Sequence, residues 1–325
     1  MTIQQLKYIV ALDEERHFAR AAEVCNVTQP GRITLSANEV LEEEIGIKIF
    51  DRTKVPLTPT KLGTQIIARA KKILREVNEI RDFVINEKND LEGELKLGVI
   101  STLSPYLIPL FIKAMKEAAP KMHFVIREAS TGQLMQDIET GALDVALMAT
   151  PTGNPNLKEH HVFNEPFVAY LNESHPFATK DFYELQASDK PELLLLQNEY
   201  CYNAQLLDIC DIKEDRKISE QFSYDISSIE TLKNLVRAQL GFAILPELSI
   251  LNENEKHLFK PFKEPKPIRE ISLVVSDTFS KKLLLEKMSR AIWDCLPETL
   301  RKDFNYRKIQ WNDSPYFINA VKGFM

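Results

Sequence analysis

Two cysteines close together in the chain are the residues best suited to carry out chemistry. Cys201 and Cys210 lie in the stretch LLLLQNEYCYNAQLLDIC, residues 193–210. The apolar spacing predicts a helix over residues 203–210, and nine positions along a helix separate two Cα atoms by about 13 Å. A disulfide tolerates about 7 Å at most, so oxidation would have to unwind this segment. The pair is therefore either a redox switch or two ordinary core cysteines, because free cysteine often behaves as a small buried hydrophobe.

The remaining cysteines and histidines predict no other chemical centre. Four cysteines without a CxxC pair disfavour zinc and a secreted disulfide framework. His160 and His161 are adjacent, so on a strand they would point to opposite faces, and we expect no metal site. Phosphate-binding glycine motifs are absent from the sequence, and we expect no cofactor. Charge within the only apolar run at the start argues against a signal peptide or membrane span, which predicts a cytoplasmic protein without a membrane partner.

The size and charge of the chain indicate several domains with one basic region. A chain of 325 residues should form two or three domains, and 44% hydrophobic with 27% charged residues is ordinary for a globular protein. The net charge is −6, yet residues 48–75 carry eight cations against Asp51 alone. This basic stripe is either a nucleic-acid contact or a solvated helix face.

The first 58 residues have the pattern of a winged helix-turn-helix. Apolar spacing predicts helices over residues 2–14 and 18–25 and a third from about Gln29 to Ile45, with Thr28 as its N-cap. Residues 47–50 and 55–57 resemble two strand edges around Asp51-Arg52-Thr53-Lys54. These four residues would form a basic wing.

The segments HFARAAEVCNVTQP, LEEEIG and IFDRTKVPLTPTKLG resemble the winged helix of the LysR family of bacterial transcription regulators. The resemblance implies that the third helix enters the major groove and that the wing holds DNA phosphate. The residues expected to contact DNA are Gln29, Pro30, Arg32, Thr34, Ser36, Arg52 and Lys54.

One spacing departs from the family. From Gly31 to Gly46 the chain has sixteen residues where about fourteen are usual, and two extra helical residues rotate the later part of the helix by roughly 200°. Either the helix begins later, near Thr34, or its base-reading face has changed. The helix is also rich in glutamate, so affinity would depend on the wing and linker.

Residues 59–90 predict a dimerising linker helix. Apolar residues alternate in fours and threes at Leu62, Ile66, Ala70, Ile73, Val77, Ile80 and Val84. In LysR-like proteins such a helix pairs two winged helices, which implies an operator of two half-sites.

Beyond residue 90 the periodicity predicts an α/β effector domain. Strands and helices alternate, with Ser104 expected as an N-cap and Ser227 to Glu230 as a capping box. The arrangement resembles the two-lobed, periplasmic-binding-protein-like domain of LysR proteins, with a cleft between the lobes. The expected fold is α+β overall, with domains at residues 1–58, 59–90 and 91–300, the last divided into lobe I (91–165 and 268–300) and lobe II (166–267), and a C-terminal extension, 301–325. The extension either packs on the effector domain or is disordered.

Within that family, GVISTLSPYLIP, EASTGQLMQDIETGALD and SSIETLKNLVRAQLGFAILP, with the Cys-x8-Cys pair, resemble the OxyR group of peroxide sensors. The resemblance implies that Cys201 is peroxidatic and Cys210 resolving, and that Thr102 and Thr131 bind peroxide. Tyr200 stands where a histidine is common and Ser276 where an arginine is expected. Missing cations would slow the reaction, because a thiolate attacks peroxide.

The sequence therefore predicts a LysR-type regulator, not an enzyme, that senses hydrogen peroxide through a reversible Cys201–Cys210 disulfide and controls oxidative-stress genes. Its expected partners are double-stranded DNA, hydrogen peroxide, further copies of itself in a homodimer or homotetramer, and RNA polymerase. One alternative is a LysR regulator that binds a small organic anion between its lobes, with structural cysteines. Another is a thiol peroxidase.

Overall fold

The structure is a computed structural model that describes residues 1–25, 33–54, 56–86, 91–184, 193–196, 200–210, 226, 228–309 and 311. The chain divides into a compact unit covering Met1–Lys88 and a second that begins at Asn89. Each has its own hydrophobic core. Among the helices in these described ranges, none combines the length and hydrophobicity that a membrane span requires.

The first unit is a winged helix-turn-helix followed by a long helix. Its elements are α1 (Ile3–Glu15), α2 (Phe18–Val24), α3 (Ile33–Ile45), β1 (Phe50–Asp51), β2 (Thr58–Pro59) and α4 (Lys61–Asn86). Thr2 begins α1 with a capping box to Gln5. Leu6, Ile9 and Leu12 point from one face of α1 into the core.

The wing strands are shorter and later than the predicted edges at residues 47–50 and 55–57. β1 and β2 pair antiparallel through Phe50 with Pro59 and Asp51 with Thr58. The N–H groups of Ile49 and Phe50 donate to Glu42 Oε1, at 2.6 and 3.2 Å. A buried carboxylate of α3 thus holds the chain where β1 begins.

The two interpretations of the extra spacing before Gly46 stay predictions, because residues 26–32 lie outside the described ranges. α3 is described from Ile33, next to Thr34, while Gln29, Pro30, Arg32 and the predicted N-cap Thr28 lie outside the described residues.

The predicted linker helix is present as α4, but the residues of its predicted seam differ in burial. Thr60 Oγ1 accepts the N–H of Gly63 at 2.9 Å and begins the helix. A Cβ at Gly63 would lie 1.9 Å from the carbonyl oxygen of Ile49, so this close approach requires glycine. Ala70 belongs to the core of the first unit, whereas Ile73 is 40% exposed. Ala70 of the predicted seam is therefore used within the chain, whereas Leu62 and Ile73 are exposed.

The second unit is built on a mixed sheet in the order β4-β3-β5-β9-β6-β7, with β8 paired to β6 and β10 to β9. Its strands are β3 (Glu92–Ile100), β4 (Lys121–Ala129), β5 (Val145–Thr150), β6 (Leu157–Tyr170), β7 (Ala243–Pro246), β8 (Phe259–Pro261), β9 (Lys266–Ser276) and β10 (Tyr306–Lys308). Its helices are α5 (Ser104–Ala118), α6 (Thr131–Glu139), α7 (Tyr200–Cys210), α8 (Ile229–Arg237), η2 (Glu247–Ile250), η3 (Lys256–Leu258), α9 (Lys282–Cys295) and α10 (Glu298–Arg301).

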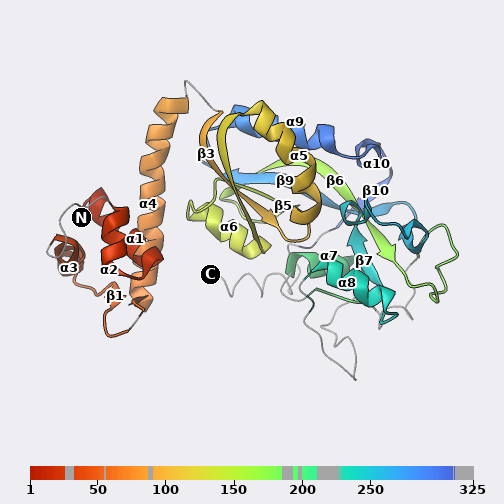
Figure 1. Ribbon diagram of the computed structural model, residues 1–325, viewed down its shortest axis with the longest axis horizontal. Helices are drawn as coiled ribbons and strands as arrows, with labels where there is room; N and C mark the ends of the chain where they lie inside the picture. Colours follow the sequence, from red (N-terminus) through yellow and green to blue (C-terminus); the bar gives the residue numbers. More distant parts are fainter. Residues whose placement is uncertain are drawn as a thin grey trace. The chain divides into compact units, whose positions relative to one another are not determined.

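Two long antiparallel strands, β6 and β9, run through both lobes of this unit. Figure 1 shows α5, α6 and α9 around β3 and β5 at one end and α7, α8 and β7 together at the other. The predicted two-lobed α/β fold is therefore confirmed, as is the predicted helix that ends at Cys210.

Two predicted caps differ from the structure. The N-cap of α5 is Leu103, without a side-chain bond, because Ser104 already belongs to the helix. The N-cap of α8 is Ser228, whose hydroxyl accepts the N–H of Thr231 at 3.2 Å. Glu230 is thus not the third residue of a capping box, and its carboxylate is available for contacts outside the helix.

Candidate functional site

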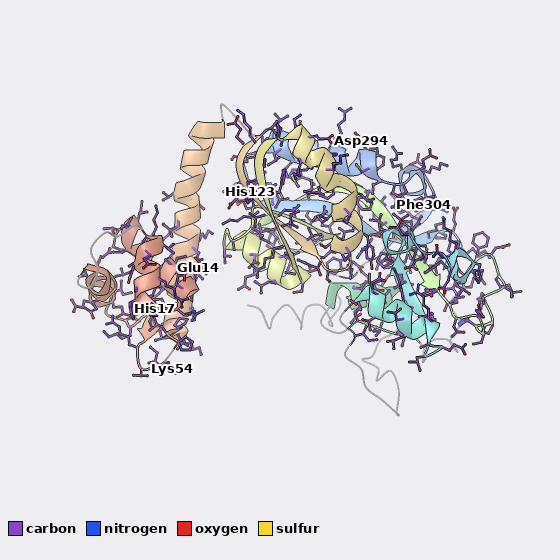
Figure 2. The ribbon with its side chains drawn as sticks, viewed as in Figure 1. Glu14, His17, Lys54, His123, Asp294 and Phe304 are labelled. Atoms are coloured by element: carbon purple, nitrogen blue, oxygen red, sulfur yellow. The ribbon has the colours of Figure 1, made fainter. Side chains whose placement is uncertain are left out.

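The wing carries the described candidate contacts to DNA. Lys54 lies in the loop between β1 and β2, at an edge of the first unit (Figure 2), with its side chain 65% exposed. A cavity of about 540 Å³ opens beside the wing, lined by Lys48, Phe50, Asp51, Arg52, Lys54, Pro59, Thr60 and Lys61. Four cations around one cavity form a surface to which a phosphate backbone can bind.

Arg52 has strong partners inside the protein. Its guanidinium donates to Glu39 Oε1 at 2.6 Å and to Glu42 Oε2 at 3.1 Å. It also lies 5.8 Å from the ring centroid of Phe18. The Glu42 side chain is almost fully buried, so Arg52 helps to neutralise a carboxylate in the core. Its expected contact with phosphate remains a prediction.

The base-reading candidates are described only in part. Thr34 and Ser36 lie in the first turn of α3, and nothing is described of their side chains. Gln29, Pro30 and Arg32 fall outside the described residues.

In the second unit the two candidate threonines lie at the same edge of the sheet. β3 and β4 are parallel neighbours, and their last residues, Ile100 and Ala129, are paired in register. Thr102 and Thr131 each follow two residues later, and both are buried. Thr131 begins α6, and Thr102 lies just before α5. Sheets of this kind bind ligands at the carboxyl ends of their strands.

A buried arginine binds Thr102. Arg269 of β9 donates from Nη1 to Thr102 Oγ1 at 2.8 Å and from Nη2 to the Thr102 carbonyl oxygen at 3.2 Å. It also pairs with Glu165 Oε2 at 2.8 Å, and both side chains are almost fully buried. Burial raises the pKa of Glu165, whereas Arg269 and the N–H of Leu248 act to lower it. The pair places a fixed cation on the hydroxyl of Thr102.

Arg269 is a buried cation on Thr102 that the sequence reasoning did not identify. Ser276 lies at the end of β9, and its hydroxyl lies 3.2 Å from that of Thr278. Arg269 lies seven positions earlier on the same strand. The signal in the sequence was an arginine between the apolar residues Ile268 and Ile271 of this strand, since a buried charge needs a partner.

The two cysteines occupy opposite ends of α7. Cys201 is the second residue of the helix and Cys210 the last, and Cys210 is buried and not part of a disulfide. The side chains of Tyr200 and Cys201 lie outside the described residues. The first turn of a helix favours a thiolate through its N–H groups and dipole. The expected role of Cys201 as the attacking residue remains a prediction.

Tyr202 connects α7 to the buried pair. Its hydroxyl donates to the Ile244 carbonyl oxygen, and its ring lies 6.4 Å from that of Phe167. The guanidinium of Arg269 lies 5.9 Å from the centroid of the Phe167 ring. Burial raises the pKa of Tyr202, Arg269 acts to lower it, and Cys210 acts to raise it further. Arg269 and Cys210 are therefore both within electrostatic range of the residue that follows Cys201.

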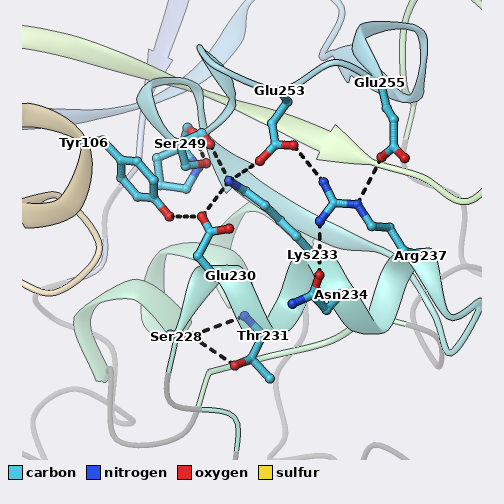
Figure 3. A network of polar contacts seen from close by, with 11 residues as sticks. Tyr106, Ser228, Glu230, Thr231, Lys233, Asn234, Arg237, Ser249, Glu253 and Glu255 are labelled. Carbon is cyan, nitrogen blue, oxygen red and sulfur yellow. Dashed lines mark hydrogen bonds and ion pairs between the residues drawn. The ribbon is translucent and has the colours of Figure 1, made fainter.

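A second polar network joins the lobes. Lys233 of α8 is buried, and its ammonium donates to Glu230 and Glu253, each at 2.8 Å, and to the carbonyl oxygen of Ser249. The hydroxyl of Tyr106, on α5, donates to Glu230 Oε1 at 2.8 Å (Figure 3). The lysine ammonium lies 5.3 Å from the Tyr106 ring centroid. The start of α5, close to Thr102, is thus tied to α8.

A winged helix-turn-helix, a long helix and a two-lobed α/β unit together define a DNA-binding regulator with a sensing domain. Residues 3–64 match the model of the bacterial regulatory helix-turn-helix protein, lysR family, and residues 88–299 match the LysR substrate binding domain. The chain belongs to the LysR family of transcription regulators.

Several of the relatives that it matches are hydrogen peroxide-inducible genes activators or OxyR proteins. The hydrogen peroxide-inducible genes activator of Haemophilus influenzae is 35% identical over 90% of this chain and 97% of its own length. A full-length OxyR variant from Pseudomonas aeruginosa, with a cysteine replaced by aspartate, is 31% identical with a TM-score of 0.75 over 91% of this chain and 99% of its own. A peroxide-bound OxyR cysteine variant from Corynebacterium glutamicum is 28% identical with a TM-score of 0.60, over 92% and 94%.

Proposed function

We propose that this LysR-type regulator senses hydrogen peroxide through reversible formation of a Cys201–Cys210 disulfide and so controls oxidative-stress genes in the cytoplasm. The observation that carries the proposal is the placement of both cysteines at the ends of one helix, whose Tyr202 lies beside the same Phe167 ring as buried Arg269. The names of the relatives in the comparison support the same function.

The chemistry takes two steps. The Cys201 thiolate attacks one peroxide oxygen, the O–O bond breaks, and a sulfenic acid forms while the leaving hydroxide takes a proton to become water. Cys210 then attacks the sulfenic sulfur, the disulfide forms, and a second water leaves. The two sulfurs lose two electrons to peroxide in total, and a thiol reductant returns them.

The buried groups have defined tasks in this proposal. A guanidinium has no acceptor atom, so Arg269 leaves the proton of the Thr102 hydroxyl free to be donated to a peroxide oxygen. Thr131, at the same sheet edge, would bind the second oxygen. The positive charge of Arg269 and the first turn of α7 favour the Cys201 thiolate.

The DNA contacts are part of the same proposal. Two copies paired through α4 would place two recognition helices on two half-sites, with Gln29, Pro30, Arg32, Thr34 and Ser36 at the bases and Arg52 and Lys54 at phosphates. Disulfide formation would change the contacts between subunits, and through them contact with RNA polymerase.

The test is peptide mapping after one equivalent of peroxide. The parent protein should form the Cys201–Cys210 link. Cys201→Ser should not react, whereas Cys210→Ser should stop at a sulfenic acid that a dimedone probe traps. If neither variant differs from the parent, or no link forms, the peroxide-sensing proposal fails and a regulator that binds a small organic anion replaces it. Consumption of many equivalents of peroxide would instead indicate a thiol peroxidase.

A further inference from the structure

The chain after α10 packs against the effector unit beyond the end of the family match at residue 299. β10 pairs parallel with the start of β9, through Tyr306 with Lys266 and Lys308 with Ile268. The N–H of Lys266 donates to the Asn305 carbonyl oxygen at 3.0 Å, and that of Ile309 to the Ile268 carbonyl oxygen at 3.3 Å. Residues 305–309 therefore form an added strand, and residues 304–309 together with Trp311 are here called the C-terminal strap.

Side chains fix the strap on both sides. Ile309 and Trp311 are buried in the core of the effector unit. The Lys308 ammonium pairs with Glu270 of β9 at 2.6 Å. Phe304, labelled in Figure 2, contacts the ring of Tyr306 edge-on, with centroids 5.9 Å apart. A buried tryptophan contributes a large apolar area, so the strap has a fixed place in the fold.

One strap residue contacts the helix that carries both cysteines. Arg307 Nη1 lies 3.3 Å from Asp208 Oδ2, with the two side chains 48% and 30% exposed. Asp208 lies between Cys201 and Cys210, two positions before the latter. The strap thus connects β9, the strand of Arg269, to the Cys210 end of α7.

That end of α7 must move for the disulfide to form. In a helix the two cysteine Cα atoms are about 13 Å apart, and a disulfide requires less than about 7 Å. The turns between them must open, and Asp208 is in the last of these turns. Opening that turn would separate Asp208 from Arg307, so the ion pair between them opposes this step.

We infer that Arg307 is a positioning residue that holds the Cys210 end of α7 through Asp208 and slows the attack of Cys210 on the Cys201 sulfenic acid. The inference rests on the proposed peroxide-sensing function. It concerns the second step alone, because Arg307 bonds to the resolving end of the helix and not to the attacking end.

The experiment measures both steps in the full-length protein. Trapping with dimedone in a Cys210→Ser background gives the rate of sulfenic acid formation. In the parent background, quenched alkylation gives the rate of disulfide formation at peroxide concentrations where it no longer depends on peroxide. Arg307→Gln is compared with Lys308→Gln, a neighbouring cation on the same strand that bonds to β9 instead.

Arg307→Gln should accelerate disulfide formation about two- to fivefold, the size of an exposed ion pair, and leave sulfenic acid formation and the thermal midpoint unchanged. Lys308→Gln should change neither rate. Asp208→Arg alone should accelerate the second step like Arg307→Gln, and combining it with Arg307→Asp should restore the parent rate.

Equal rates in the parent and Arg307→Gln, a slower second step, or an equal acceleration by Lys308→Gln would each overturn the inference while the sensing function stands. A parent that forms no Cys201–Cys210 link would overturn the sensing function and the inference together. A fall in the thermal midpoint that accounts for the faster step would show that Arg307 stabilises the fold in general and does not position α7.

Discussion

At the residue scale, Arg52 and Arg269 are each held in place by an ion pair with a buried glutamate. Arg269 is bound by buried Glu165 and Arg52 by buried Glu42. Removing one partner of a buried pair leaves an uncompensated charge, which costs more than the net contribution of the intact pair. Substitutions at both positions therefore have consequences for folding as well as for function.

At the residue scale, Arg52→Ala should lower the free energy of unfolding of the winged unit by about 1–3 kcal/mol, because Glu42 loses a charged donor. It should also weaken DNA binding almost equally across sequences if the guanidinium reaches phosphate. Urea unfolding and DNA titration at several salt concentrations measure the two effects.

Lys54→Ala is the matched control for Arg52→Ala. Its ammonium is exposed and 3.8 Å from Asp51, so stability should hold while the salt dependence of DNA binding becomes less steep. Loss of base specificity with unchanged affinity in either variant would contradict the assignment of the wing to phosphate.

At the element scale, α4 packs in the core of the winged unit and leaves further apolar side chains outside that core. Ile67 and Ala70 pack in the winged unit, while Ile73 is exposed and Val77 half-buried. We expect the exposed apolar positions to meet a second copy of the helix. Dimerisation through α4 should therefore depend on its later turns.

The double variant Ile73→Asp with Val77→Asp should raise the dissociation constant of the dimer at least about tenfold, because an unpaired carboxylate in an apolar seam costs more than about 1.4 kcal/mol. Operator binding should be lost with it, and the effector unit should remain folded. Sedimentation measures the assembly.

Lys72→Asp is the control, because it adds a carboxylate one position away from the predicted seam and should leave the dimer intact. A double variant that still sediments as a dimer would disprove the linker assignment.

At the scale of the whole effector unit, two kinds of connection join the lobes. β6 and β9 cross between them as continuous strands, and the network around Lys233 connects α5 with α8 (Figure 3). Burial acts to raise the pKa of Glu230, but hydrogen bonds from Lys233 and Tyr106 outweigh it and lower that pKa below its ordinary value of 4.5. The ionised carboxylate is therefore the form that stabilises the folded state.

This shift predicts an acid-dependent loss of stability. A carboxyl group with a lower pKa in the folded state than in the unfolded state contributes stability above the unfolded pKa and loses it as the pH falls through the folded pKa. Stability should thus decline below about pH 4.5, and Glu230→Gln should make that decline shallower. Chemical unfolding across this range measures the effect. Glu298→Gln, on an exposed side chain, is the control, and identical profiles for the parent and Glu230→Gln would contradict the role of the network.

The sequence by itself determined the helices, the linker, the two-lobed α/β class and the helix that ends at Cys210. Each of these depends on apolar spacing within a short stretch, and local spacing is what sequence patterns express. The same local evidence gave the wrong N-cap at Ser104 and assigned Glu230 to a capping box. An N-cap depends on one side-chain hydrogen bond, and this bond is lost when the helix begins one residue earlier or later than predicted.

The tertiary structure alone decided which charges meet. Arg269 reaches Thr102 across 167 positions of sequence, and Glu230 reaches Tyr106 across 124. Arg307 reaches Asp208 from an extension whose role the sequence left open. Such contacts depend on strand register and on the packing of helices against the sheet. A charged side chain in isolation carries no information about its partner, because that partner is fixed only when distant segments are packed together.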